Sequence, residues 1–216
     1  KTLADFALRH YFPELLADAR PYPALLREAT ERTARLMAQW QAVGFCHGVM
    51  NTDNMSLLGL TLDYGPYGFM EAYDPGYICN HSDPDGRYAY EQQPQIGAWN
   101  CTCLAQAMLP LMEVDEAREA LSVYGEIFST EYMRLMCAKL GLPFEEASAP
   151  LVTDALDLLA RSRTDYTIFF RALARFDASP GAINSNIRDL FIAREDFDAW
   201  AGKYGERLRA IGSHGA

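Results

Sequence analysis

Apolar residues recur at helical spacing over most of the chain, which predicts a mainly helical protein. A first apolar surface covers residues 3–19, with a fresh turn expected at Pro13. A second covers residues 24–43, where leucine, alanine, methionine and tryptophan recur three or four positions apart and Gly44 is suited to end the helix. The spacing returns after Trp99, which we expect in the core, and Asn100, a suitable helix N-cap. It predicts further helices at residues 100–110, 115–139, 145–162, 165–176 and 195–211.

Residues 54–63 have a different pattern, because their apolar and polar side chains alternate. A turn at residues 58–59 would make this stretch a small β-hairpin with its apolar side chains on one face and residue 54 opposite residue 63. Because Leu58 is poorly suited to positive φ, we expect a bulged or longer turn. Opposed Cβ atoms lie about 5 Å apart, so the amide oxygen of Asn54 and the carboxylate of Asp63 could share a cation. Hard oxygen ligands suit Mg²⁺ or Mn²⁺. An ordinary half-buried hairpin with polar ends would show the same alternation.

The residues around this stretch resemble a known family. The similarity begins with His47-Gly48-Val49-Met50-Asn51-Thr52-Asp53-Asn54 and Asp63-Tyr64-Gly65-Pro66, and continues through Tyr73-Asp74-Pro75, Cys79-Asn80-His81-Ser82-Asp83, Gly86-Arg87-Tyr88-Ala89, Gln93-Pro94, Trp99-Asn100 and Leu104-Ala105-Gln106-Ala107. These segments resemble the catalytic loop and metal-binding region of the selenoprotein O family, whose members are pseudokinases with a kinase-like fold. The resemblance implies a protein adenylyltransferase, which transfers AMP from ATP to serine, threonine or tyrosine hydroxyls of proteins with Mg²⁺ or Mn²⁺.

The same segment can be compared with the catalytic loop of protein kinases, which reads H-R-D-x-x-x-x-N and is followed by D-F-G. His47 and Asn54 keep the spacing of the kinase histidine and asparagine, but Val49 stands where the kinase base would be. The resemblance implies that Asp53 is the proton acceptor. It also implies that Asn54 and Asp63 are the metal ligands, with Asp63 meeting the nucleotide phosphates through the metal.

Two features of a kinase-type nucleotide site are missing from this sequence. It has no glycine-rich phosphate loop, and its three lysines are Lys1, Lys139 and Lys203, none of them in a strand like that of the kinase lysine. Both features lie upstream of the catalytic loop in kinases. We therefore expect residues 1–216 to be a single helical C-terminal lobe of a kinase-like fold, mainly α with one small hairpin. Residues 46–98 would hold the catalytic loop, the metal hairpin and an activation-loop-like segment. The N-terminal lobe and the family's C-terminal tail would be absent, and this stretch alone inactive.

Composition narrows the classes of partner. The chain has 19 basic and 29 acidic residues and a net charge of −10, which argues against nucleic acid as a partner. It has no uninterrupted apolar run of 18 residues, so we expect no membrane span. Its five cysteines lack the rhythm of a disulfide framework, which suits a reducing compartment. We expect ATP and protein substrates as partners, in the cytoplasm of a bacterium or the mitochondrion of a eukaryote.

Two alternatives to the adenylyltransferase remain open. A kinase-type phosphotransferase would use the same metal ligands, although it should have aspartate in place of Val49. A non-catalytic helical interaction module would keep the site only as a remnant. For individual side chains, we expect His47 to orient the loop through backbone hydrogen bonds and Cys79 to be a free or a redox-sensitive thiol. Two further sets have simpler expected roles: His81, Asp83 and Arg87 would contact substrate or brace their loop, and Tyr166, Phe169, Phe170 and Phe176 would pack between helices.

Overall fold

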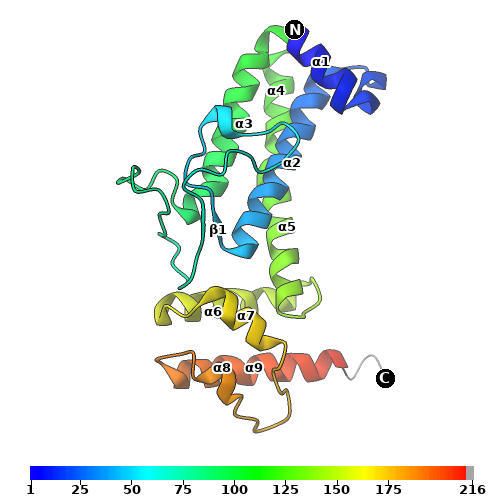
Figure 1. Ribbon diagram of the computed structural model, residues 1–216. Helices are drawn as coiled ribbons and strands as arrows, with labels where there is room; N and C mark the ends of the chain where they lie inside the picture. Colours follow the sequence, from blue (N-terminus) through cyan, green and yellow to red (C-terminus); the bar gives the residue numbers. More distant parts are fainter. Residues whose placement is uncertain (213–216) are drawn as a thin grey trace.

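The computed structural model describes residues 1–212, so the last four residues of the predicted 1–216 unit lie outside it. The described part is mostly helical and has one antiparallel pair of short strands (Figure 1). The helices are α1 (Thr2–Tyr11), α2 (Pro21–Val43), α3 (Gln93–Met108), α4 (Val114–Ser122), α5 (Tyr124–Lys139), α6 (Ala149–Ser162), α7 (Tyr166–Leu173), α8 (Ser185–Arg188) and α9 (Arg194–Gly212), and the strands are β1 (Phe45–Cys46) and β2 (Gly68–Phe69). No helix of the described residues is both long enough and apolar enough to cross a membrane.

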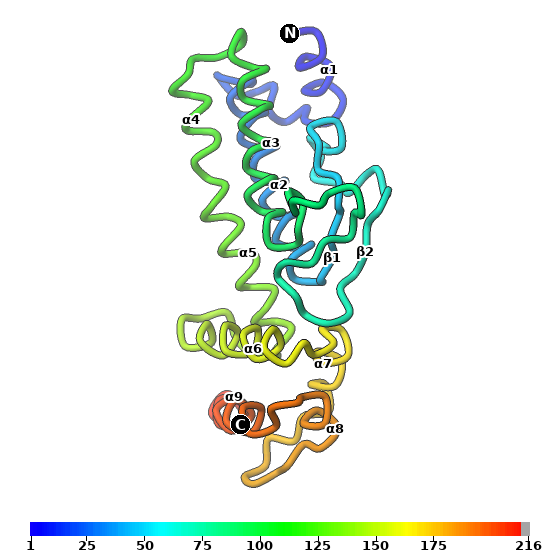
Figure 2. Tube along the Cα trace, turned by 90° about the vertical axis from the view of Figure 1, so that its left-hand side faces the viewer, coloured from blue at the N-terminus to red at the C-terminus, as the bar shows by residue number. Residues whose placement is uncertain are grey.

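Helix α2 is the central element of the upper part of the molecule. It lies against α3, α4 and α5, and its apolar side chains are buried on several sides (Figures 1 and 2). Gly44 ends the helix in the left-handed conformation, with φ +71°, where glycine carries no steric cost. The predicted second helix is therefore confirmed. The first predicted helix is confirmed as α1, and the fresh turn expected at Pro13 is confirmed as well, because Pro13 begins a separate 3₁₀ turn, Pro13–Ala17.

The position predicted for the hairpin is wrong. The strand pair joins Phe45 to Phe69 and Cys46 to Gly68, so it encloses residues 47–67 instead of forming inside them. Within that segment lie the 3₁₀ turn Thr52–Asn54 and a turn closed by the amide of Gly59 on the carbonyl of Ser56, 3.1 Å away.

The reason is that this stretch packs against α2 instead of against itself. Leu57 and Leu58 both pack against the apolar cluster to which α1, α2, α3 and α4 contribute. Gly59 approaches α2 so closely that an added Cβ would lie 2.8 Å from that of Arg32. The indole N–H of Trp40 on α2 also donates to the hydroxyl of Thr61, at 2.9 Å. Burial against α2 replaces the strand pairing that alternation alone predicts.

Several helix boundaries also differ from the prediction: α6 begins at Ala149 instead of residue 145, α7 ends at Leu173 instead of residue 176, and α8 was not predicted. Helix α3 begins at Gln93, upstream of the predicted start, because Pro94 fits the first turn of a helix. Asn100 is therefore a buried residue inside the helix and not its N-cap, and Trp99 is 45% exposed and not a core anchor. The predicted 115–139 helix is interrupted at Val123, where α4 ends and α5 begins.

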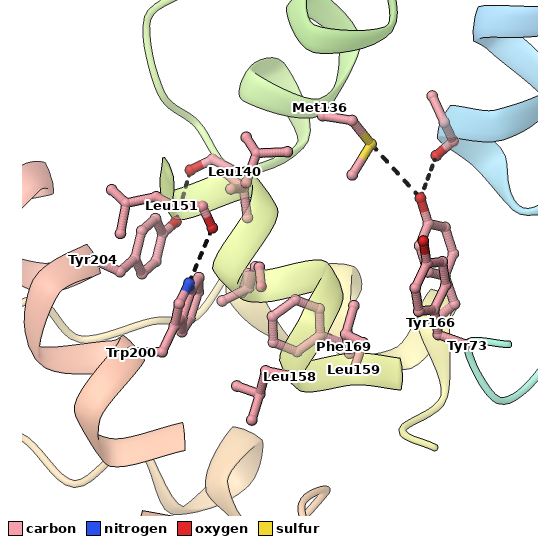
Figure 3. Packing of buried hydrophobic residues seen from close by; sticks show 14 of the residues in the cluster. Tyr73, Met136, Leu140, Leu151, Leu158, Leu159, Tyr166, Phe169, Trp200 and Tyr204 are labelled. Carbon is pink, nitrogen blue, oxygen red and sulfur yellow. Dashed lines mark hydrogen bonds between the residues drawn. The ribbon is translucent and has the colours of Figure 1, made fainter. Parts of the chain in front are cut away.

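Helices α6, α7, α8 and α9 form a lower layer at the end of α5 (Figures 1 and 2). Its core is aromatic and is joined to the upper part by hydrogen bonds from buried rings (Figure 3). The hydroxyl of Tyr166 donates to the carbonyl of Ala42 at 3.0 Å, and that of Tyr204 to Leu140 at 2.7 Å. Phe169 is fully buried between them. The predicted packing role of Tyr166, Phe169, Phe170 and Phe176 is confirmed, because the first two lie in this core and the other two pack against it.

Candidate functional site

The site is built on the segment between β1 and β2, and His47 holds its two ends together. His47 is fully buried and its ring stacks on Trp40, with centroids 5.2 Å apart. Its Nδ1 accepts the amide of Val49 at 3.4 Å, so Nε2 carries the proton and donates to the carbonyl of Leu62 at 2.8 Å. The predicted orienting role of His47 is confirmed. Its ring ties the loop after β1 to the residue immediately before Asp63.

Two further hydrogen bonds, from Cys79 and Asn80, hold the backbone of this loop. The amide of Asn80 donates to the carbonyl of Gly48 at 3.1 Å, and the thiol of Cys79 donates to the carbonyl of Cys46 at 3.4 Å. An added Cβ on Gly48, whose φ is +82°, would lie 2.6 Å from the sulfur of Cys79, so only glycine fits there. The neighbouring thiol of Cys46 lowers the pKa of Cys79, and the thiol of Cys79 together with burial raises the pKa of Cys46. A redox role for Cys79 stays a prediction.

Asp53 and Asn54 lie on the 3₁₀ turn Thr52–Asn54 that follows this loop. The side-chain amide of Asn54 donates from Nδ2 to the carbonyl of Val49 at 3.1 Å. This bond uses the nitrogen and leaves the side-chain oxygen as the acceptor available for a ligand. Asp53 is exposed, so its carboxylate can be reached by a substrate.

Asp63 occupies an unusual backbone conformation. Its φ is +56°, in the left-handed region that is uncommon for residues other than glycine, asparagine and aspartate. The amide of Gly65 donates to the carbonyl of Asp63 at 2.8 Å and closes a tight turn there. The carboxylate is exposed. Sparsely populated backbone conformations of this kind concentrate at functional sites.

An exposed aromatic cluster lies beside Asp63. The ring of Phe45 packs edge-on against that of Phe69, with centroids 5.3 Å apart, and stacks on that of Tyr67 at 5.9 Å. Tyr64 packs edge-on against Tyr67 at 5.2 Å. Tyr64, Tyr67 and Phe69 are each about half exposed. The strand pair thus presents an open apolar surface next to the candidate metal ligand.

The predicted site residues therefore share one anchor. Asn54 is bonded to Val49, and Asp63 follows the residue bonded to His47, so both depend on the same three-residue loop. Among residues 1–212 no group of three or more histidines, cysteines or acidic residues is arranged to hold a metal. The candidate donor set is accordingly small, an amide oxygen and a carboxylate oxygen. Mg²⁺ and Mn²⁺ accept such sets because they keep several waters and bind substrate phosphates.

Residues 81–88 show how the activation-loop-like segment is held. The carboxylate of Asp83 accepts the backbone amides of Arg87 at 3.0 Å and Tyr88 at 2.8 Å. The hydroxyl of Tyr88 donates to the side chain of Asn51 at 2.6 Å, which joins this segment to the loop that carries Asp53 and Asn54. Of the two roles expected for Asp83, the structure shows loop bracing. His81 is exposed.

Helix α3 binds the backbone of the loop through two side chains, and the sequence pattern did not predict these contacts. The side chain of Gln93 bonds both Phe45 and His47, and that of Asn100 bonds Met50. Both amides are buried inside a helix whose apolar pattern is weak. Their only signal in the sequence was that they fall within the segments that resemble the family.

Comparison with known proteins shows the family of the chain. The family model described as "Protein adenylyltransferase SelO" matches residues 1–215. Three curated bacterial relatives carry the name "Protein nucleotidyltransferase YdiU". The protein from Thiobacillus denitrificans is 58% identical over 210 residues, which cover 97% of this chain and 43% of the relative. Those from Myxococcus xanthus and Herminiimonas arsenicoxydans are 54% and 50% identical, over 98% and 97% of this chain and 44% and 42% of their own lengths.

These relatives are named as nucleotidyltransferases, the class that the resemblance of the sequence implied. The chain belongs to the SelO family of protein adenylyltransferases, which confirms the resemblance seen in its sequence. It spans less than half the length of the curated relatives it matches.

Proposed function

We propose that this chain is the catalytic-loop part of a protein adenylyltransferase, folded as the C-terminal lobe of a kinase-like domain. Its complete protein would transfer AMP from ATP to serine, threonine or tyrosine hydroxyls of other proteins in the cytoplasm. The family membership and the names of the relatives support this activity. The bond from His47 to Leu62 is the structural observation that carries it, because it couples the loop bearing Asp53 and Asn54 to the backbone bearing Asp63.

The donor chemistry of the site fits a divalent cation. Asn54 and Asp63 would hold Mg²⁺ or Mn²⁺, which when bound neutralises charge on the phosphates of ATP. The bond from Asn54 to Val49 supports this assignment, because it fixes which end of the amide faces away from the loop. The left-handed backbone of Asp63 supports it as well, since such a conformation persists only where the surroundings hold it.

The remaining chemistry belongs to Asp53. An exposed carboxylate next to a metal ligand is suited to accept the proton of an incoming hydroxyl as that oxygen attacks the α-phosphorus of ATP and pyrophosphate leaves. Val49 stands where kinases carry their base and cannot accept a proton, and the resemblance to the family implies Asp53 as the acceptor instead. The exposed aromatic cluster of Tyr64, Tyr67 and Phe69 would be covered by the rest of the complete protein and its nucleotide.

The test is product analysis with the complete protein, ATP, Mn²⁺ and a protein substrate. We expect the substrate to gain one adenylyl mass and pyrophosphate to be released. We expect Asp63→Ala to abolish the transfer, and Asp53→Ala to lower its rate by about 10²–10⁴-fold, the usual contribution of a general base. Asp115→Ala, at an exposed position of α4, is the matched control and should leave the rate unchanged.

Each outcome separates the proposal from its alternatives. A phosphorylated substrate together with ADP would show a kinase-type phosphotransferase. Binding of partners without either product would show a non-catalytic interaction module. Wild-type rates in Asp63→Ala would refute the metal role of this residue, even if AMP transfer itself were observed.

A further inference from the structure

The backbone of residues 45–50 is held mainly by side chains. Only residues 45 and 46 belong to a strand, yet five of the six carbonyl groups accept a hydrogen bond from a side chain. Cys79, Asn80 and Asn54 supply three of these bonds from nearby loops. The other two come from α3, an independent and regular element. This division raises the question of what α3 contributes to the site.

Gln93 forms two hydrogen bonds with the backbone at the beginning of the loop. Its Nε2 donates to the carbonyl of Phe45 at 2.8 Å, and its Oε1 accepts the amide of His47 at 2.9 Å. The side chain is fully buried, so both polar ends are paired with backbone groups two residues apart. A buried amide is costly unless it is paired in this way, and its loss would leave two backbone groups without partners.

Asn100 forms a hydrogen bond with the backbone at the end of the loop. Its Nδ2 donates to the carbonyl of Met50 and, within α3, to that of Ile96, both at 3.0 Å. Only 6% of the residue is exposed. Since residues seven apart in a helix lie on the same face, Gln93 and Asn100 reach the loop from one side of α3. Met50, which Asn100 contacts, lies two residues before the turn Thr52–Asn54.

Gly97 fixes α3 itself between these two residues. An added Cβ there would lie 2.8 Å from Cγ of Met37 on α2 and 2.6 Å from the hydroxyl of Tyr124 on α5. The hydroxyl of Tyr124 in turn donates to the carbonyl of Pro94 at 2.6 Å. Helix α3 is thus packed tightly against α2, and Tyr124 at the start of α5 contacts the same face, which bears Gln93 and Asn100. Any displacement of the loop must break bonds to this rigid support.

We propose that Gln93 and Asn100, named here the α3 clamp, are positioning residues that set the place of the loop carrying Asp53 and Asn54. The inference rests on the proposed function and extends it to residues outside the loop. The clamp does not touch the reacting groups. It acts through His47 and Met50, which lie before the turn that presents the candidate base and metal ligand.

The test uses the complete protein with Gln93→Met and Asn100→Leu, which keep the approximate volume of each side chain and remove its bonds. Gln95→Met is the matched control, because Gln95 is an exposed residue of the same helix turn. The concentration of Mn²⁺ that gives half-maximal AMP transfer is measured for each variant. This quantity does not depend on the fraction of folded enzyme, so a variant that is merely less stable does not change it.

We expect the half-activating Mn²⁺ concentration to rise about fivefold or more in both clamp variants, and to stay at the wild-type value in Gln95→Met. We also expect excess Mn²⁺ to restore part of the lost rate. An unchanged half-activating concentration in both clamp variants would overturn the inference, whatever happened to the maximal rate. If Gln93→Met does not fold, Gln93→Glu keeps the length and the acceptor for His47 while removing the donor to Phe45.

Hydrogen exchange separates failure of the clamp from failure of the proposed function. In wild type the amide of His47 donates to Gln93, so its exchange should be slow and should accelerate in Gln93→Met only. If wild type transfers no AMP, the proposed function fails, and this measurement still decides whether the clamp exists. Equal exchange in wild type and Gln93→Met would overturn the clamp independently of activity.

Discussion

The bond between His47 and Leu62 offers the sharpest test of how the site is assembled. His47→Phe removes both ring nitrogens but keeps an aromatic ring to stack on Trp40, so it isolates the hydrogen bonds from the packing. A typical hydrogen bond contributes about 0.5–1.5 kcal/mol, and a carbonyl left unpaired adds about 1–3 kcal/mol when it is fully buried. Because the contact is only partly buried, we expect the free energy of unfolding to fall by about 1–2 kcal/mol.

This loss should appear in function as well as in stability. One or two kcal/mol corresponds to about a 5- to 30-fold change in an equilibrium. If the bond holds Asp63 beside the loop, its loss weakens cation binding by the same 1–2 kcal/mol, which is about 5- to 30-fold. The half-activating Mn²⁺ concentration should then rise by about the same factor. The assays are denaturant unfolding and Mn²⁺ titration of AMP transfer by the complete protein.

His10→Phe is the control for this experiment. His10 is an exposed histidine on α1, and its replacement should leave the half-activating Mn²⁺ concentration at the wild-type value. The reasoning is refuted if His47→Phe lowers the free energy of unfolding while its half-activating Mn²⁺ concentration stays at that of His10→Phe. His47 would then stabilise the fold without coupling the loop to Asp63.

Two further predictions concern the lower layer and its junction with α2. Phe169→Ala should lower the free energy of unfolding by about 3–5 kcal/mol, the usual cost of truncating a buried phenylalanine, and a loss below 1 kcal/mol in denaturant unfolding would contradict the described core. Burial lowers the pKa of Lys139 from 10.5 to about 8, so the folded chain releases this proton more readily than the unfolded chain. The free energy of unfolding should therefore rise with pH between about 8 and 10.5, and Lys139→Met should lack that component when both proteins are unfolded at about pH 7.5 and 9.5. Equal pH dependence of the two proteins would show that Lys139 is not desolvated beside Ala42 and the rings of Tyr166 and Phe170.

Much of the fold could be predicted from local pattern. The helix Pro21–Val43 and its end at Gly44 follow from apolar periodicity and the conformational freedom of glycine, which are properties of neighbouring residues. The buried aromatic residues of α7 follow from the same periodicity. Helix α3 began earlier than predicted because Pro94 is compatible with a first helical turn, although it reads as a break in a linear pattern.

The residues of the candidate site stay a prediction, and the architecture predicted for them is wrong. Asp53, Asn54 and Asp63 were named from a short segment whose resemblance to a family is specific. The alternation between them predicted a hairpin, whereas the structure places that stretch against α2 and forms the strand pair outside it. Alternation records which side chains avoid water, and a neighbouring helix can bury them as well as a second strand can.

The sequence by itself therefore determined most of the helices and the family, and it named the residues of the candidate site, because each of these depends on local spacing or on a short ordered motif. Only the tertiary structure decided what holds those residues in place. His47 reaches Leu62 across 15 positions, and Gln93 and Asn100 reach the loop across 46 and 50. Such contacts exist because α3 packs against α2 through Gly97, and the meeting of two helices depends on the shapes of both surfaces.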